Sequence, residues 1–180
     1  MNLVSEDKPL RIFIVEDEAL IVMELRGRLR ALGYHVCGSA ASGETALLQL
    51  PVSAADIVLL DVHLAGQLNG VETASKLREQ CELPVVFLTA FSDSTLIDQA
   101  KEVVPYGFLV KPFEERELHA TLQMVFYKHR LDMHLKNANS RLEKAVSERT
   151  IELARVNEQL KEKKNQQLVH QQHYDTEKTH

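Results

Sequence analysis

Acidic side chains directly follow two short apolar runs in this sequence of 180 residues. Glu16 and Asp17 come after RIFIV, and Asp61 comes after IVLL. Three carboxylates brought together repel one another unless a cation lies among them. Mg²⁺ suits such a set, because it binds a few carboxylates together with phosphate oxygens and water. The three residues therefore predict a magnesium site.

A threonine and a lysine stand at the ends of two further apolar runs. Thr89 ends PVVFLT, and Lys111 follows YGFLV. A carboxylate such as Asp61 can accept a phosphoryl group and become an acyl phosphate. Mg²⁺, a hydroxyl and an ammonium group can then each stabilise one oxygen of the transferred group. A single aspartate after a strand is more often a helix cap or a turn residue, but the combination predicts phosphoryl transfer to Asp61.

These residues need a fold that gathers the ends of the apolar runs. Short apolar runs rich in branched residues indicate strands covered on both faces, as in a parallel sheet. The runs lie at 11–15, 35–40, 56–60, 84–89 and 106–110, and stretches of helical period separate them at 19–32, 43–50, 71–80 and 95–103. Ser42 is the expected N-cap of the second helix. The alternation predicts a doubly wound α/β domain with a flavodoxin-like, five-stranded parallel sheet, in which ligands bind at the carboxyl ends of the strands.

The rest of the chain lacks helix breakers. No proline or glycine occurs from Glu114 to the last residue, which favours one long helix. From residue 135 onwards, core-type residues alternate at spacings of four and three, as in a two-stranded coiled coil. Arg149 interrupts this seam, and a lone charged helix or a disordered segment is the alternative interpretation. The predicted seam consists of Leu135, Asn139, Leu142, Val146, Leu153, Val156 and Leu160.

These patterns divide the chain into four parts. We expect an N-terminal extension at 1–8 and the α/β domain at 9–130. A coiled-coil helix at 131–164 should continue directly from the last helix of that domain. The final stretch at 165–180 has no apolar period, and we expect a frayed or disordered tail there.

Charge and composition disfavour several classes of partner. The net charge is −5, and residues 1–130 carry 12 basic and 18 acidic side chains, so the body of the protein is unsuited to gripping the phosphates of nucleic acid. No apolar window is long enough to span a membrane, and the N-terminus does not resemble a signal peptide. Cys37 and Cys81 lack the spacing of a zinc or disulfide framework. We expect a cytoplasmic protein that binds neither nucleic acid nor membranes.

Four motifs occur in a defined order along the chain: Glu-Asp at 16–17, Asp61, Thr-Ala at 89–90 and Lys-Pro-Phe at 111–113. In type, order and spacing they resemble the receiver domain of bacterial two-component response regulators, over about residues 9–130. The resemblance implies that a sensor histidine kinase phosphorylates the aspartate. It also implies no enzyme activity beyond Mg²⁺-dependent self-phosphorylation and dephosphorylation.

The same resemblance assigns roles to individual residues. Thr89 and Lys111 are expected to contact the phosphoryl group, and Phe108 to be an aromatic switch that rotates inward when Thr89 moves. The loop after the acceptor departs from the family, because it lacks the usual proline and is one residue longer. The implied magnesium ligands are Glu16, Asp17, Asp61 and the backbone carbonyl of His63.

Two outputs fit the C-terminal helix. The segment SERTIELARVNEQLKEK at 147–163 resembles the signalling helices that join sensory modules to catalytic domains. We expect a homodimer that passes the signal through its coiled coil to an unknown downstream protein. The alternative is the N-terminal input part of a larger sensor histidine kinase or nucleotide cyclase, whose catalytic motifs are not found in this sequence.

Functions outside signalling fit the residues less well. A haloacid-dehalogenase-type phosphatase also uses an aspartate at a strand end with Mg²⁺, but it needs a second aspartate at position 63, where His63 stands. A flavodoxin-like binding module would have to hold an anionic flavin phosphate against an acidic rim. Neither alternative uses the whole set of residues at the strand ends.

Overall fold

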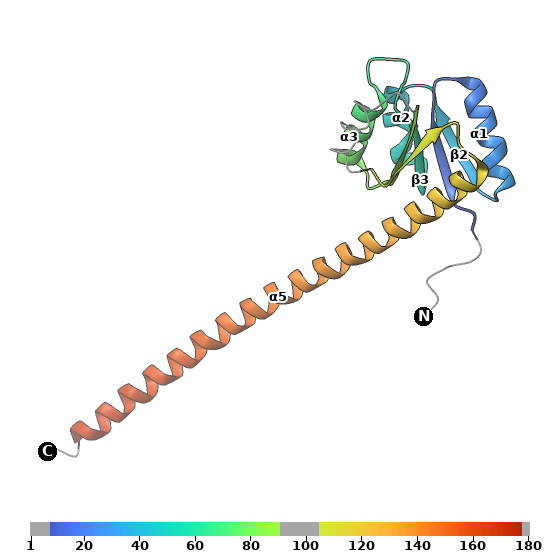
Figure 1. Cartoon of the computed structure of the whole chain (residues 1–180). Coiled ribbons are helices and arrows are strands. Elements are labelled where there is room, and N and C mark those ends of the chain that lie inside the picture. The colour runs from blue at the N-terminus through green and yellow to red at the C-terminus, as the bar shows by residue number, and fades with distance from the viewer. Residues whose placement is uncertain (1–7, 91–104, 178–180) are drawn as a thin grey trace. The chain divides into compact units, whose positions relative to one another are not determined.

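The computed structural model of the chain describes residues 8–90 and 105–177, with side chains as far as residue 167. Five strands form one parallel sheet in the order β2-β1-β3-β4-β5, which confirms the predicted flavodoxin-like fold (Figure 1). The strands are β1 (Arg11–Val15), β2 (His35–Ala40), β3 (Ile57–Asp61), β4 (Val85–Ala90) and β5 (Gly107–Lys111).

Helices connect and follow these strands. Their bounds are α1 (Ala19–Ala31), α2 (Gly43–Gln49), the short 3₁₀ helix η1 (Leu50–Val52), α3 (Gly70–Gln80) and α5 (Glu115–Glu177). As expected, the Ser42 side chain caps α2 by accepting a hydrogen bond from the backbone N–H of Thr45. The helix expected at 95–103 lies outside the described residues.

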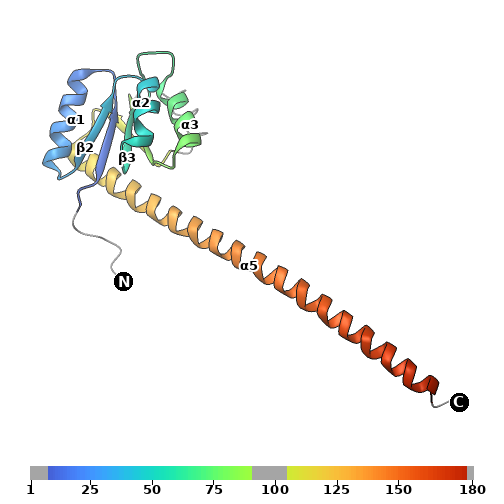
Figure 2. The same ribbon diagram turned by 180° about the vertical axis from the view of Figure 1, so that it is seen from behind.

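Two hydrophobic layers cover the sheet, one on each face. Alternate residues of a strand point to opposite faces, so neighbours such as Phe13 and Ile14 enter different layers. One layer packs α1 and the first turns of α5 on the sheet through Leu25, Leu29, Leu118, Leu122 and Val125. The other packs α2 and α3 through Ala46, Val71, Ala74 and Leu77. Figure 1 and the reverse view in Figure 2 show α1 on one side of the sheet and both α2 and α3 on the other.

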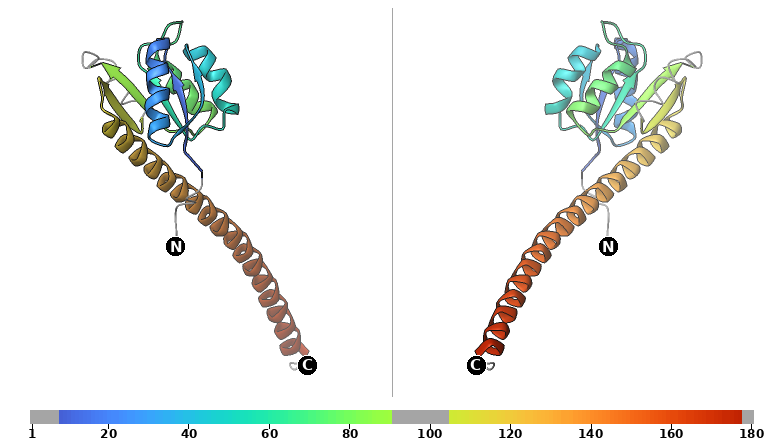
Figure 3. Two further views of the ribbon diagram at one scale, coloured as in Figure 1. Left: turned by 90° about the vertical axis from the view of Figure 1, so that its right-hand side faces the viewer. Right: turned by 90° about the vertical axis from the view of Figure 1, so that its left-hand side faces the viewer.

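The long C-terminal helix is present, and it extends further than the sequence indicated. Helix α5 is unbroken from Glu115 to Glu177, as Figure 3 shows from gold to red. The expected frayed tail at 165–180 is therefore helical over most of its length. The physical reason is that residues such as Lys163 and Gln167 have high helix propensity and no breaker interrupts them. By its contacts, the chain divides into two compact units at Leu131 and Asp132. None of the described helices has the length and apolar character that crossing a membrane requires.

The N-terminal ends of two central strands are tied together by an ion pair. The Arg11 guanidinium donates to both carboxylate oxygens of Asp56, at 3.1 Å to Oδ2 and 2.9 Å to Oδ1. The backbone N–H groups of the two residues add further bonds, at 2.8 Å to Asp56 Oδ2 and 2.8 Å to the Arg11 carbonyl. The pair therefore fixes the register between β1 and β3 at the N-terminal ends of the strands, opposite the ends that carry Glu16 and Asp61.

Gly70 sits where the chain returns to the sheet after the loop that follows β3. Its backbone N–H donates to the Val62 carbonyl at 2.9 Å, and Asn69 and Glu72 form a capping box at the start of α3. A Cβ atom at Gly70 would lie 2.0 Å from the backbone oxygen of Asp61. Only glycine allows α3 to approach the end of β3 this closely.

We expect Gly70→Ala to lower the free energy of unfolding by about 1 to 3 kcal/mol, because the added methyl forces rigid backbone apart. Gly27→Ala is the matched control, since a Cβ atom there meets nothing within 4 Å in α1. That change should stabilise the helix by up to about 1 kcal/mol. Urea unfolding followed by circular dichroism measures both. Equal stabilities of the two variants would contradict the close approach at Gly70.

The pair of Arg11 and Asp56 predicts acid sensitivity. Burial by itself raises the pKa of Asp56, but the hydrogen bonds and charge of Arg11 outweigh it and lower the pKa below its usual value. A depressed carboxyl pKa stabilises the fold above the unfolded pKa of about 3.9, and this contribution disappears as the pH falls through the folded pKa. Asp56→Asn should therefore lower the urea midpoint at pH 7 and have a smaller effect at pH 3. A constant difference at both pH values would argue against the ion pair.

Candidate functional site

The carboxyl ends of three strands carry the charged residues singled out in the sequence. Glu16 directly follows β1, Asp61 is the last residue of β3, and Lys111 is the last residue of β5. Because all strands run parallel, these ends share one edge of the sheet. The register places Asp61 opposite Leu88 and Lys111 opposite Ala90 on the two sides of β4.

The Lys111 ammonium joins the two carboxylates. Its Nζ lies 2.7 Å from Glu16 Oε2 and also donates to Asp61 Oδ2. Glu16 is only 1% exposed and Asp61 only 6%, while the Lys111 side chain is 24% exposed, so the contact is partly buried. The structure thus brings together residues that are 50 and 95 positions apart in the chain.

Burial and neighbouring charge shift the protonation of this cluster. Burial, followed by the adjacent Asp61, raises the pKa of Glu16 to about 7, although Lys111 partly opposes the shift. Burial on its own lowers the pKa of Lys111, but the hydrogen bonds that its ammonium donates to Asp61 and Glu16 outweigh burial, so the net pKa is raised. Lys111 therefore remains a cation at neutral pH, and it compensates the charge of two carboxylates held close together.

The sequence predicted that Asp17 comes together with Glu16 and Asp61, but Asp17 lies outside the contact of these residues with Lys111. It is exposed, and its Oδ2 accepts a hydrogen bond from the backbone N–H of Ala65 at 3.1 Å. In the part of the chain that the structure describes, no three acidic, histidine or cysteine side chains are gathered as a metal centre. The reason is that the exposed Asp17 carboxylate binds a loop N–H while Lys111 supplies the positive charge between the other two.

Of the remaining predicted residues, His63 contacts Asp61, while Thr89 and Phe108 lie on β4 and β5. The backbone N–H of His63 donates to Asp61 Oδ1 at 3.0 Å, so the two carboxylate oxygens have different partners. Thr89 is fully buried near the end of β4, and its hydroxyl donates to the Ala90 carbonyl at 3.2 Å. The ring of Phe108 on β5 stacks on Phe87, with 5.7 Å between centroids.

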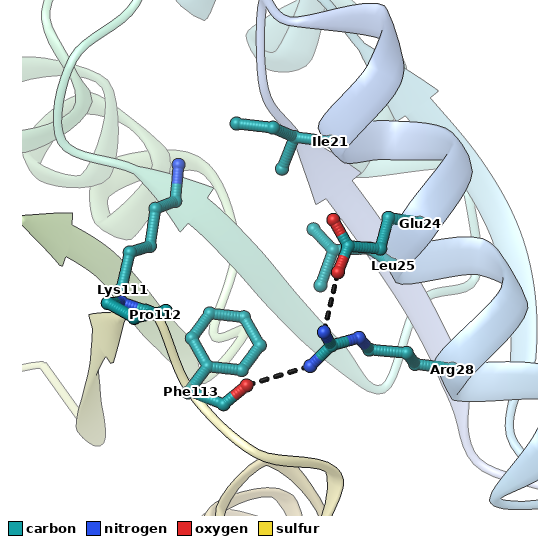
Figure 4. Close-up of a pocket in the computed structure, with 7 residues that line it drawn as sticks. All are labelled: Ile21, Glu24, Leu25, Arg28, Lys111, Pro112 and Phe113. Atoms are coloured by element: carbon teal, nitrogen blue, oxygen red, sulfur yellow. Dashed lines mark hydrogen bonds and ion pairs between the residues drawn. The ribbon is translucent and has the colours of Figure 1, made fainter.

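Helix α1 contacts the turn that follows Lys111, and sequence reasoning missed this contact. Arg28 Nη1 donates to the Phe113 carbonyl at 2.7 Å, and its Nη2 pairs with Glu24 at 2.5 Å. The guanidinium also lies 5.9 Å from the centre of the Phe113 ring. These residues line a cavity of about 340 Å³ together with Lys111, whose side chain runs along one side of it (Figure 4). The only sequence signal was the spacing of Glu24 and Arg28 by one helical turn.

The chemistry of the donor set fits a hard divalent cation. Glu16 and Asp61 are carboxylates forced together in a buried place, and a nearby third carboxylate, Asp17, follows directly in the chain. Oxygen ligands of this kind suit Mg²⁺. The same place offers a carboxylate nucleophile, an ammonium group and a backbone N–H. Such an arrangement is suited to accepting and stabilising a phosphoryl group.

The model of the response regulator receiver domain family matches residues 12–123. The transcriptional regulatory protein PdtaR of Mycobacterium tuberculosis is 34% identical over 122 residues, which cover 68% of this chain and 59% of that protein. The chain spans less than two thirds of the length of this relative and of the probable transcriptional regulator ycf27 of Porphyridium aerugineum, where coverage is 52%.

Solved receiver domains have the same fold. One is the signal receiver domain of a modulated diguanylate cyclase from Desulfovibrio desulfuricans G20, which is 39% identical to this chain. The match covers 69% of this chain and 99% of that domain, with a TM-score of 0.66. The receiver domain of the sensor histidine kinase PA1611 from Pseudomonas aeruginosa PAO1, described with a magnesium ion coordinated in its active site cleft, is 27% identical. It covers 66% of this chain and 98% of its own, with a TM-score of 0.60. From its matched sequence, its sheet and the residues at the strand ends, this chain belongs to the response regulator receiver domain family.

Proposed function

We propose that this protein is a response regulator phosphorylated on Asp61 by a sensor histidine kinase. The observation that carries the proposal is the partly buried contact of Lys111 with both Asp61 and Glu16. A carboxylate oxygen of Asp61 attacks the phosphorus of the kinase phosphohistidine, the P–N bond breaks, and the imidazole leaves. Lys111 then stabilises the negative charge on the oxygens of the new acyl phosphate.

The proposed metal ligands are the side chains of Glu16, Asp17 and Asp61 and the backbone carbonyl of His63. Bound there, Mg²⁺ would neutralise charge on the phosphoryl oxygens during transfer. Their chemistry and the magnesium named for the Pseudomonas receiver support this assignment. We propose no catalysis by the chain beyond its own phosphorylation and dephosphorylation.

We propose that phosphorylation shifts a population between two arrangements. The Thr89 hydroxyl, which donates to the Ala90 carbonyl here, would turn to the phosphoryl group in the active arrangement. Movement of Thr89 would then change the space open to the Phe108 ring, which packs on Phe87. A ligand shifts such an equilibrium only by its difference in affinity for the two states. Thr89 and Lys111 would supply that difference by binding the phosphoryl oxygens better in the active arrangement.

The C-terminal unit supports a dimeric output. Leu142, Val146 and Leu153 are each more than 60% exposed in the single chain. They belong to the seam with alternating spacings of four and three, which a second copy of the same helix would cover. We therefore propose a parallel homodimer whose coiled coil passes the signal to a downstream partner that is neither nucleic acid nor membrane.

A second candidate is the input part of a larger sensor histidine kinase or nucleotide cyclase. Its support is the 39% identity to the receiver of a modulated diguanylate cyclase. Phosphorylation and the coiled coil would keep the same roles in that case. The two candidates differ only in whether the partner is a separate protein or a following domain.

Incubation of the full chain with acetyl phosphate and Mg²⁺ should add about 80 Da, the mass of one phosphoryl group. Peptide mapping should place it on Asp61. Removal of Mg²⁺ with EDTA should abolish the adduct, because charge on the transferred oxygens is then not neutralised. Asp61→Asn should remove the adduct while the circular dichroism spectrum stays unchanged. An equal mass gain in the variant would exclude Asp61 as the acceptor.

Leu153→Ala should raise the dimer dissociation constant by about tenfold or more, since each dimer loses two apolar side chains from its seam. Ile151→Ala is the matched control. Ile151 is also exposed, 68% against 62% for Leu153, but it lies two positions away from the seam. Sedimentation equilibrium measures both constants. A monomeric wild-type chain, or equal effects of the two changes, would contradict the proposed seam.

A further inference from the structure

The loop after Asp61 is held without a proline. No proline occurs between Pro51 and Pro84. The loop begins at Val62 and is closed by the hydrogen bond from the Gly70 N–H to the Val62 carbonyl at 2.9 Å. Between these ends it must present the backbone of His63 beside the acceptor. Some other contact therefore has to limit its conformations.

Glu44, at the start of α2, provides that contact. Its Oε1 accepts hydrogen bonds from two successive backbone N–H groups, Gln67 at 2.9 Å and Leu68 at 3.0 Å. Successive N–H groups that converge in this way form an anion-binding concavity, and here the anion is a carboxylate of the same chain. The contact spans more than twenty positions of sequence and links α2 to the loop.

Gly66 makes room for this carboxylate. Its φ is +124°, a conformation that L side chains rarely adopt. A Cβ atom at Gly66 would also lie 2.7 Å from Glu44 Oε2. Hydrogen bonds from the Glu44 backbone N–H and then the Gln67 N–H lower the pKa of Glu44, so its carboxylate is charged at neutral pH. The backbone conformation of Gly66, the space beside it and the charge of Glu44 therefore all favour a carboxylate at this position.

A second carboxylate, that of Asp17, contacts the same loop. Asp17 Oδ2 accepts from the Ala65 N–H at 3.1 Å. Asp17 is also a proposed magnesium ligand, so its bond to the loop competes with metal binding. Glu44 is not a proposed ligand, so metal binding does not compete with its two hydrogen bonds to the loop.

We propose that Glu44 is a positioning residue for the magnesium site: it holds the loop over residues 63–68 so that the His63 backbone stays beside Asp61. The inference rests on the proposed function, because the loop matters to chemistry only if Mg²⁺ and a phosphoryl group bind at Asp61. It adds a residue outside the ligand set that controls metal affinity, and it explains how the loop keeps its shape without proline.

The test uses the full chain, with Mg²⁺ alone as the probe. Glu44→Ala should weaken Mg²⁺ binding, measured by isothermal titration calorimetry, by about tenfold or more, as loss of a residue that orients metal ligands typically does. Amide hydrogen exchange at Gln67 and Leu68 should become faster. Glu44→Gln keeps an acceptor oxygen and should restore part of the affinity. Glu79→Ala, which removes one exposed carboxylate from α3, is the matched control and should change neither readout.

The outcomes separate the two proposals. A wild-type chain that binds no Mg²⁺ would overturn the magnesium site together with the role of Glu44. Normal wild-type binding with unchanged affinity in both Glu44 variants would overturn only the positioning role. Faster exchange at Gln67 and Leu68 with normal Mg²⁺ affinity would overturn it as well, since the loop would then be held for stability alone.

Discussion

The partly buried contact of Lys111 with Glu16 and Asp61 is the constraint that the rest of the site depends on. Two carboxylates at the end of a buried sheet repel each other, and a cation between them makes the arrangement stable. The parallel sheet brings the three groups together from β1, β3 and β5, although they are far apart in sequence. The ammonium group of Lys111 supplies the positive charge beside both carboxylates.

The fold and the central contact were predictable because they follow from short patterns. Near-continuous apolar runs indicated buried strands, and Ser42 indicated the start of α2. Each observed strand lies within a residue of its expected position. Once the strands are parallel, polar residues at their ends must share one edge of the sheet. Glu16, Asp61 and Lys111 are therefore near one another for reasons visible in the sequence.

The surrounding support was not predictable in the same way. Asp17 binds Ala65, Glu44 binds Gln67 and Leu68, and Arg28 binds the Phe113 carbonyl. Each contact joins an exposed or half-exposed side chain to a backbone group of a loop or turn far along the chain. Charged surface residues have no periodic pattern that marks such partners. The helix beyond residue 164 was missed for a different reason, because absence of an apolar period does not prevent helix where propensity is high.

The hydrogen bond between Gly70 and Val62 closes the loop of the acceptor at its base. Between fixed ends, the entropy of closing a loop grows only with the logarithm of its length. Extending a loop from about seven to about eight residues therefore costs only about 0.1 kcal/mol. Chain entropy therefore sets almost no limit on the length of this loop, but the hydrogen bonds of its backbone N–H groups to Asp17 and Glu44 fix the residues near its tip. A change in the length of this loop is therefore limited by those side-chain contacts and not by the entropy of closing it between Val62 and Gly70.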